Sequence, residues 1–413
     1  MNFSIISNFN RLLIPVILVI LAGCSSYHPV KTTSSWETFL HDGARTNSSS
    51  DEVELPVRLM WDKKISPFEL FKGYPKEQLS SPVIHGNVLY IGSTDKTFYA
   101  FDLGSGKRLW ESGSGGFIES IATVSDGHVY FGSSDGLLRA LNAADGKELW
   151  RFNTNSEIIS SPLVRSSILY LYSSGNRVYA VDIKTGEKLW RYTHPVFQTI
   201  SMRSHSSPAS STDGKMIYQV FSDGTLSALD SGTGRAVWSK KLFTGAPPAG
   251  QYRRTPVVNG DTVFAIGESL KVHAFDAASG RLKNRYGKAA ARDFIVSDKG
   301  KVIIAGEKSV LAVSIATGHE QWESAVEVGS VLSMMRAGKK IFLLSNSVTK
   351  LLGLNFLTSR KGFLQAIDMA DGRTLFKKRL SSSISAGSSS AGGVLALFTD
   401  RGVIEVWAAK GSR

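Results

Sequence analysis

The side chains that most often carry chemistry in enzymes are present in this chain, but they are scattered. The histidines never lie within five residues of one another, so a metal-binding spacing such as H-x-x-x-H is absent. Neither a phosphate-binding loop motif nor a G-x-S-x-G nucleophile motif occurs. We therefore expect no catalytic, cofactor-binding or metal-binding residues and predict that the protein is not an enzyme. The eight histidines are His28, His41, His85, His128, His194, His205, His273 and His319.

The single cysteine, Cys24, is the one side chain whose setting predicts a chemical modification. Arg11 is followed by an apolar run over residues 12–21, interrupted by Pro15 and too short to span a membrane. The run suits a signal peptide over residues 1–23. It leads into Leu-Ala-Gly-Cys, which resembles a bacterial lipobox, so we predict that Cys24 is lipidated and begins the mature chain. An ordinary signal peptide with an incidental cysteine is the alternative.

Two features bear on where such a chain would work. By resemblance to proteobacterial lipoproteins, the Ser-Ser pair after Cys24 implies the periplasmic face of the outer membrane, with acyl chains such as palmitate as the anchor. The formal charge is +13, with 42% hydrophobic and 20% charged residues. An exported protein meets little nucleic acid, so anionic lipids or acidic proteins are the alternative partners for this charge. The cations are spread through every repeat, which favours an ordinary solvated surface.

A repeat of about 40 residues occupies most of the chain. Three successive copies end in Leu-Trp at Trp110, Trp150 and Trp190, and further copies end at Trp238 and Trp322 and, more degenerately, at Asn284 and Phe376. Every copy has a glycine four residues before that position. Asp, Asn or Ser stands four residues before the glycine, which predicts a turn stabilised by the polar side chain. The glycines are Gly106, Gly146, Gly186, Gly234, Gly280, Gly318 and Gly372.

Each copy reads as four short strands, and four-stranded units at this period predict a β-propeller. Seven copies are complete, and residues 385–407 supply three strands of an eighth. The missing strand is predicted at residues 58–64, around Trp61. The sequence thus predicts an all-β, eight-bladed propeller whose ring is closed by an N-terminal strand. Its predicted divisions are a signal peptide (1–23), a lipid-anchored linker (24–57) and the propeller (58–413).

The repeats resemble the PQQ-type propeller repeat, and together with the lipobox the chain resembles the BamB family of lipoproteins, over essentially its whole length. That resemblance implies a non-enzymatic scaffold, a monomer within the outer-membrane β-barrel assembly machinery, docked on periplasmic domains of BamA. The segment 199–208 resembles the family's docking loop, with Ile200, Met202 and Arg203 at the contact positions. The alternative is that Ile200 and Met202 are core residues of an inner strand. Arg253 and Arg254 replace acidic residues of the family, so either the partner has the opposite charge at this point or the partner is not BamA.

Two further functional classes stay open. Quinoprotein alcohol dehydrogenases share the repeat, but they resemble one another in a cysteine pair, which the mature chain cannot form. A cell-envelope propeller with another partner or ligand is the other alternative. Strand alternation places the long excursions 193–205, 243–252 and 345–361 on one face, where we expect a partner to bind. The third excursion contains Leu351, Leu352, Leu354, Phe356 and Leu357, and is read either as a lid on its own blade or as a docking patch.

Overall fold

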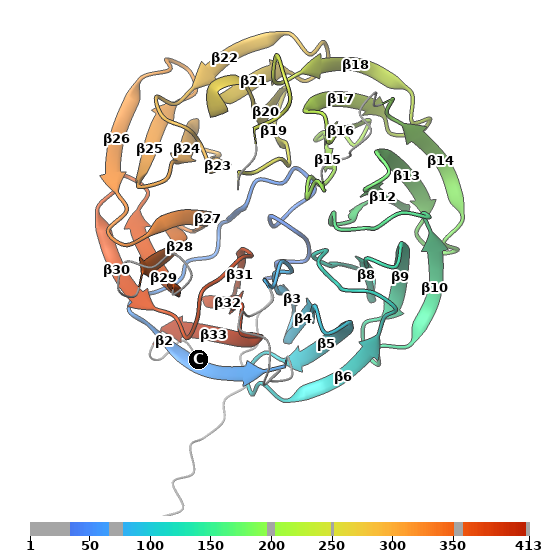
Figure 1. Ribbon diagram of the computed structural model, residues 1–413, viewed down its shortest axis with the longest axis horizontal. Coiled ribbons are helices and arrows are strands. Elements are labelled where there is room, and N and C mark those ends of the chain that lie inside the picture. The colour runs from blue at the N-terminus through green and yellow to red at the C-terminus, as the bar shows by residue number, and fades with distance from the viewer. Residues whose placement is uncertain (1–33, 66–76, 196–202, 249–251, 351–357, 410–413) are drawn as a thin grey trace, which may run out of the picture.

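The computed structural model describes residues 34–65, 77–195, 203–248, 252–350 and 358–409, and the structural statements below concern these residues. Eight small antiparallel sheets are arranged as blades around a central axis (Figure 1). The predicted eight-bladed all-β propeller is confirmed. No helix in the described part of the chain is long and apolar enough to cross a membrane.

The first four blades follow the chain from the inner strand to the outer strand. Blade 1 contains β3 (Val83–His85), β4 (Val88–Gly92), β5 (Thr97–Asp102) and β6 (Arg108–Gly113). Blade 2 contains β7 (Thr123–Ser125), β8 (His128–Gly132), β9 (Leu137–Asn142) and β10 (Glu148–Asn153). Blade 3 contains β11 (Leu163–Arg165), β12 (Ile168–Ser173), β13 (Arg177–Asp182) and β14 (Lys188–Thr193). Blade 4 contains β15 (Ala209–Ser210), β16 (Met216–Val220), β17 (Thr225–Asp230) and β18 (Ala236–Lys241).

The remaining blades repeat this order, except for the additions at the two chain ends. Blade 5 contains β19 (Val257–Asn259), β20 (Thr262–Ile266), the short 3-10 helix η1 (Glu268–Leu270), β21 (Val272–Asp276) and β22 (Leu282–Tyr286). Blade 6 contains β23 (Asp293–Val296), β24 (Lys301–Ala305), β25 (Ser309–Ser314) and β26 (Glu320–Ala325). Blade 7 contains β27 (Ser330–Ala337), β28 (Lys340–Lys350), β29 (Thr358–Asp368), β30 (Thr374–Arg379) and β1 (Ser48–Ser49). Blade 8 contains β31 (Ser388–Ala391), β32 (Val394–Phe398), β33 (Val403–Ala409) and β2 (Val57–Lys64).

The apolar core lies between neighbouring blades, because each blade packs both of its faces. The middle strands are therefore buried over most of their length and mainly apolar: in β5 the four residues from Phe98 to Phe101 are all buried. The outer strands alternate instead, and in β6 the buried Trp110 lies between the exposed Leu109 and Glu111. The repeated tryptophan is thus the apolar residue that the outer strand contributes to the space between two blades.

Each repeated tryptophan lies against the repeated glycine of the next blade. Trp190 donates its Nε1–H to the carbonyl of Ser231 (2.9 Å), and a Cβ on Gly234 would lie 2.5 Å from its ring. Gly234 also has a φ of +72°, so the contact and the turn both require glycine. Between blades 5 and 6 the pattern lapses: Asn284 faces Gly318, and its nearest atom is 3.6 Å from where a Cβ would stand. The same Trp–Gly contact joins Trp61–Gly106, Trp110–Gly146, Trp150–Gly186, Trp238–Gly280 and Trp322–Gly372.

The ring closes between the two ends of the chain, as predicted. Strand β2 pairs antiparallel with β33, with Val57 opposite Ala409 and Trp61 opposite Val406. Trp61 donates its indole N–H to the carbonyl of Leu103 in blade 1 (2.7 Å), so it occupies the repeated tryptophan position. This pairing completes blade 8 and leaves no three-stranded unit in the ring.

Residues 34–57 differ from the linker that the sequence predicted. They cross the middle of the ring (Figure 1) and pair with the inner edges of several blades. Trp36 exchanges two backbone hydrogen bonds with Ile84 (2.7 and 3.0 Å), and β1 pairs in parallel with β27. Trp36 and Val53 are buried in the core. The inner strands present unpaired backbone groups to the channel, and this segment satisfies part of them, so it belongs to the propeller.

Candidate functional site

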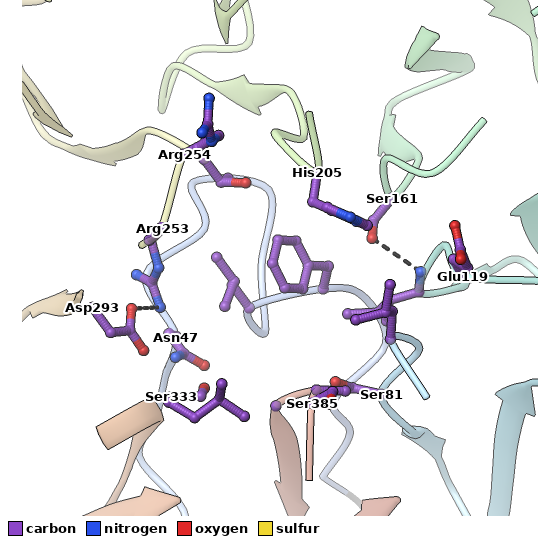
Figure 2. A pocket seen from close by; sticks show the side chains of 18 of the residues that line it. Asn47, Ser81, Glu119, Ser161, His205, Arg253, Arg254, Asp293, Ser333 and Ser385 are labelled. Atoms are coloured by element: carbon purple, nitrogen blue, oxygen red, sulfur yellow. Dashed lines mark hydrogen bonds and ion pairs between the residues drawn. The ribbon is translucent and has the colours of Figure 1, made fainter. Parts of the chain in front are cut away.

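The face through which the chain enters each inner strand is hollowed by a cavity of about 450 Å³ on the ring axis. Its floor is the N-terminal segment, which contributes Trp36, Phe39 and Leu40. Its walls are the connectors between blades, whose labelled side chains surround the axis in Figure 2. We call this the connector face. A cavity of this size with an apolar floor and converging polar groups has the ordinary character of a binding site.

Repeated hydroxyl side chains hold the cavity wall together. The backbone N–H of Ile121 donates to Ser161 Oγ (3.1 Å), that of Ser161 donates to Ser207 Oγ (2.9 Å), and that of Ser207 donates to Thr255 Oγ1 (3.0 Å). Each bond joins one blade to the next. The sequence signal for it is a Ser or Thr directly before the proline that precedes an inner strand, as in Ser161-Pro162. This repeat was not used to predict the site.

Arg45, on the N-terminal segment, is a fully buried cation on the channel side of the ring. It donates from Nε to the carbonyl of Pro208 (3.0 Å) and from Nη2 to that of Pro162 (3.0 Å). It also donates from Nη1 to Thr38 Oγ1 (2.8 Å) and to the carbonyl of Phe39 (2.7 Å). Burial lowers the pKa of Arg45 to about 9. The residue fixes the floor of the cavity to blades 3 and 4, and its position outside the repeat hid it from sequence reasoning.

Arg203 lies on the connector face beside the cavity, in the segment predicted to dock on a partner. Its side chain is 48% exposed, and it donates from Nη2 to Glu119 (2.6 Å) and from Nε to Glu157 (3.0 Å). The two carboxylates come from the connectors that precede blades 2 and 3, so the guanidinium bridges three consecutive connectors. The other two predicted contact residues, Ile200 and Met202, lie outside the described residues.

Arg253 has a different place from the one predicted. Its side chain is 6% exposed and forms an ion pair with Asp293 (2.7 Å), which is 4% exposed (Figure 2). The same carboxylate accepts the backbone N–H groups of Phe294 and Met334 (both 2.8 Å). Arg253 therefore joins blades 5 and 6 in the cavity wall and does not present a charge to a partner.

Arg254, the next residue in the connector before β19, does not contact Asp293. Its guanidinium stacks over the ring of Tyr252, 4.8 Å from the centroid, and it lies 3.5 Å from the carbonyl oxygen of Pro248. Within the described part of the chain it forms no ion pair. Neighbouring His205 also lines the cavity, and desolvation together with the charges of Arg203 and Arg254 lowers its pKa to about 4. Arg254 is thus the cavity cation whose charge is left uncompensated.

The donor set of the cavity does not fit a calcium-bound quinone. Such a site needs several carboxylate and amide oxygens converging on one ion. Among the described residues, no group of three or more histidine, aspartate, glutamate or cysteine side chains is placed to hold a metal. In the cavity wall, Asp293 is already bonded to Arg253 and two backbone N–H groups, and Glu119 to Arg203.

The described parts of the excursion 345–361 are two paired strand ends that extend blade 7. Strands β28 and β29 stay paired beyond the blade, from Ser345 opposite Phe363 to Lys350 opposite Thr358. Val348 on this extension is 58% exposed. The leucines and Phe356 of residues 351–357 lie outside the described residues, so the choice between a lid and a docking patch remains a prediction.

Comparisons with known proteins bear on the family. A family model described as "Outer membrane protein assembly factor BamB" matches residues 94–324, more than half of the chain. None of the curated protein sequences compared with the chain matches it. Among solved structures, BamB from Moraxella catarrhalis is 18% identical with a TM-score of 0.68, covering 86% of this chain and 100% of its own.

Enzymes share the fold as well. A europium-containing methanol dehydrogenase is 13% identical with a TM-score of 0.69, covering 92% of this chain and 99% of its own. A quinohemoprotein alcohol dehydrogenase from Comamonas testosteroni is 15% identical with a TM-score of 0.68, covering 92% and 81%. At such identities the structural likenesses show the propeller fold alone. The match of the family model decides the family: the chain belongs to the outer membrane protein assembly factor BamB family.

Proposed function

We propose that the protein is a lipid-anchored, non-enzymatic scaffold for outer-membrane protein assembly, working on the periplasmic side of the outer membrane. Membership of the BamB family supports the process. The observation that carries the mode of action is the connector face, which combines an open cavity with a half-exposed arginine at its edge. The partner proposed for this face is a BamA-like protein with periplasmic domains.

Arg203 is the proposed centre of that contact. Glu119 and Glu157 hold two edges of its guanidinium, so the side chain is oriented before a partner arrives and loses little rotamer freedom on binding. Burial of an oriented arginine beside apolar side chains is a frequent composition for an interface hot spot. Ile200 and Met202, the preceding residues of the same connector, are the proposed apolar neighbours.

Two arginines, Arg253 and Arg254, were expected to repel a partner that has basic residues at this place. Because Arg253 is buried, it does not contribute to that repulsion. Only Arg254 offers a positive charge where other family members are acidic, and it lies flat on Tyr252. A BamA-like partner with basic residues there would meet one cation instead of two. Changing Arg254 to Asp should therefore strengthen binding to a basic partner surface and weaken binding to an acidic one.

Co-purification of the lipidated protein from outer membranes tests the docking face. Arg203→Ala should lower the affinity for the partner by about thirtyfold, and the triple change of Ile200, Met202 and Arg203 to Ala should abolish recovery. Arg191→Ala, an exposed arginine on the outer strand β14, is the matched control and should recover the partner at wild-type yield. Equal recovery by the triple variant, with an unchanged melting curve, would place the docking face elsewhere.

Two assays examine the remaining parts of the proposal. Metabolic labelling with a fatty-acid analogue should tag the wild type and leave Cys24→Ser unlabelled; equal labelling would end the lipid-anchor hypothesis. Incubation with PQQ and calcium should produce no dye-linked alcohol oxidation above a denatured control, because Cys24 is the only cysteine and no calcium-type donor set was found among the described residues. Turnover above that control would favour the dehydrogenase alternative.

A further inference from the structure

Five of the eight outer strands carry a net positive charge: β2, β14, β18 and β22 are each +2, and β30 is +3. The outer strands β30 and β2, which follow one another around the rim in Figure 1, contain six Lys and Arg residues and one Asp, a formal charge of +5. The adjacent outer strand β26 contains two Glu and no cation, a formal charge of −2. Strands β30 and β2 are therefore the most positive pair of neighbouring outer strands in the described part of the chain, ahead of the pairs β14–β18 and β18–β22 at +4 each.

A shallow groove joins the end of β30 to the start of β2. Arg58 and Leu59 line it from blade 8, and Lys378 and Arg379 line it from blade 7. Lys377 is paired with Glu327 (2.6 Å), but Arg58, Lys63, Lys378 and Arg379 form no ion pair within the described part of the chain. Their charges are directed to solvent, where they are available to an anionic surface.

Two exposed apolar side chains lie within this pair of strands. Leu59 is 43% exposed and Met60 is 38% exposed, and they are consecutive residues. The outer strands of blades 1 to 3 carry one such residue each, for example Leu189 at 50%. We define the basic rim patch as Arg58, Leu59, Met60, Lys63, Lys378 and Arg379. Cations around a small apolar centre are the composition of surfaces that bind the headgroup region of a bilayer.

The course of the N-terminal segment brings the predicted anchor to the same blade. Ser34, the first described residue, accepts a hydrogen bond at Oγ from the backbone N–H of Gly392 (2.7 Å), in the turn between β31 and β32 of blade 8. Ser34 is the tenth residue after Cys24, and ten residues of extended chain reach up to about 35 Å. The rim of blade 8 is three strand spacings, about 15 Å, from its inner strand. A lipid on Cys24 can therefore reach a bilayer that touches this rim.

We propose that the basic rim patch binds anionic phospholipid headgroups, so that the ring stands on the rim of blades 7 and 8 at the membrane. The inference takes the lipid anchor from the proposed function, but it concerns a surface apart from the connector face. With the ring on its rim, the axis runs along the membrane and the connector face opens sideways, clear of the bilayer. The cations supply attraction to the headgroups, and Leu59 and Met60 enter between them.

Vesicle binding by the mature chain with Cys24→Ser tests the patch without the anchor. Vesicles of phosphatidylcholine mixed with phosphatidylglycerol should bind this protein more tightly than phosphatidylcholine alone, and added salt should weaken the binding. Replacing Arg58, Lys63 and Lys378 together by Gln should lower the affinity for the mixed vesicles by about a hundredfold. The matched control replaces Lys188, Arg191 and Lys240, three exposed cations of blades 3 and 4, and should lower it by less than about threefold.

A dye on a single introduced cysteine reports which part of the rim meets the lipid. In the Cys24→Ser background, a polarity-sensitive dye on Met60→Cys should shift to the blue on mixed vesicles, and the same dye on Leu189→Cys should not. Equal losses from the two triple variants, or equal shifts at the two positions, would overturn the proposal. So would a patch variant that binds vesicles normally but loses a co-purifying protein, because the patch would then serve an acidic partner. Loss of lipidation at Cys24 would leave these results unchanged, which separates the two failures.

Discussion

The outer rim and the inner rim of the ring are held together by opposite means. At the outer rim a tryptophan of one blade packs on a glycine of the next and donates one hydrogen bond, as Trp190 does to Ser231. At the inner rim buried polar groups dominate, with Ser161 accepting the N–H of Ile121, Arg253 paired with Asp293, and Arg45 beneath the floor. The contact at the outer rim stabilises the ring by burying apolar surface. The contacts at the inner rim stabilise it only if every buried polar group keeps its hydrogen-bond partner.

This difference explains why the docking of a protein partner is expected at the inner rim. The Trp–Gly contact at the outer rim is nearly the same between most pairs of neighbouring blades, so its residues repeat along the sequence. Polar groups at the inner rim can be rearranged singly, and each rearrangement changes the shape and charge of the cavity. The contrast predicts that single changes at the inner rim have effects specific to their site, while changes at the outer rim follow the presence or absence of the tryptophan ring.

The largest effect is expected at Arg45. Arg45→Met keeps most of the side-chain volume but leaves the carbonyls of Pro162, Pro208 and Phe39 without their donor, so the free energy of unfolding should fall by about 4 kcal/mol. Urea denaturation followed by tryptophan fluorescence measures it. Arg45→Lys, which keeps the charge but not the fork of donors, should lose less. A loss below about 1 kcal/mol for Arg45→Met would mean that the inner rim does not depend on this residue.

Removal of an outer-rim tryptophan comes next. Trp190→Ala should lower the free energy of unfolding by about 3 kcal/mol, because a large buried ring and its hydrogen bond to Ser231 are lost. Trp190→Phe keeps most of the ring contact and should lose about 1 kcal/mol. If the two variants unfold at the same urea concentration, the hydrogen bond rather than the ring carries the contact.

A pair of glycines sharpens the same contrast. Gly234 and Gly318 both have a φ of +72°. A Cβ at Gly234 would clash with the ring of Trp190, whereas a Cβ at Gly318 would lie 3.6 Å from its nearest neighbour, Asn284. Gly318→Ala should reduce the free energy of unfolding by about 1 kcal/mol from backbone strain alone, and Gly234→Ala by about 2–3 kcal/mol. Equal melting temperatures for the two variants would show that the tryptophan ring yields freely.

The smallest effect concerns His205 at the inner rim. Its folded-state pKa of about 4 lies below the ordinary 6.5, so the unfolded chain binds the proton first as the pH falls. Stability should therefore decrease between about pH 6.5 and about pH 4, by less than about 1 kcal/mol because part of the ring is exposed. Arg254→Gln should raise the pKa of His205, which NMR titration of the ring measures. An unchanged pKa would mean that Arg254 does not act on the cavity.

The fold could be predicted because its determinants recur. A tryptophan, a glycine and a polar turn residue return about every 40 residues, and Trp61 identifies the strand that completes blade 8. The path of residues 34–57 could not be predicted, since Trp36 and Arg45 belong to no repeat. Trp36 and Arg45 bond to backbone groups, such as those of Ile84 and Pro208, and any residue type could supply these groups.

The candidate site was predicted only in part, and one sequence signal was overlooked. The connector face was inferred from strand alternation, and Arg203 does lie there. Arg253 was misread because it was considered alone, although Asp293 stands one repeat later in the chain and so on the neighbouring blade. Glu157 precedes Arg203 by about one repeat in the same way. Opposite charges one period apart are candidates for ion pairs between blades.

The N-terminal segment that crosses the ring also dictates when folding can finish. The pairing of Ser48 with Arg336, and of Val57 with Ala409, joins residues that are far apart along the chain. Contacts so distant along the chain close large loops and slow the final step of folding. Until blade 8 has been synthesised, β2 has no partner and the cavity lacks the part of its wall that Ser385 and Ser388 line. The cavity of the connector face therefore needs blade 8 as well as the N-terminal segment.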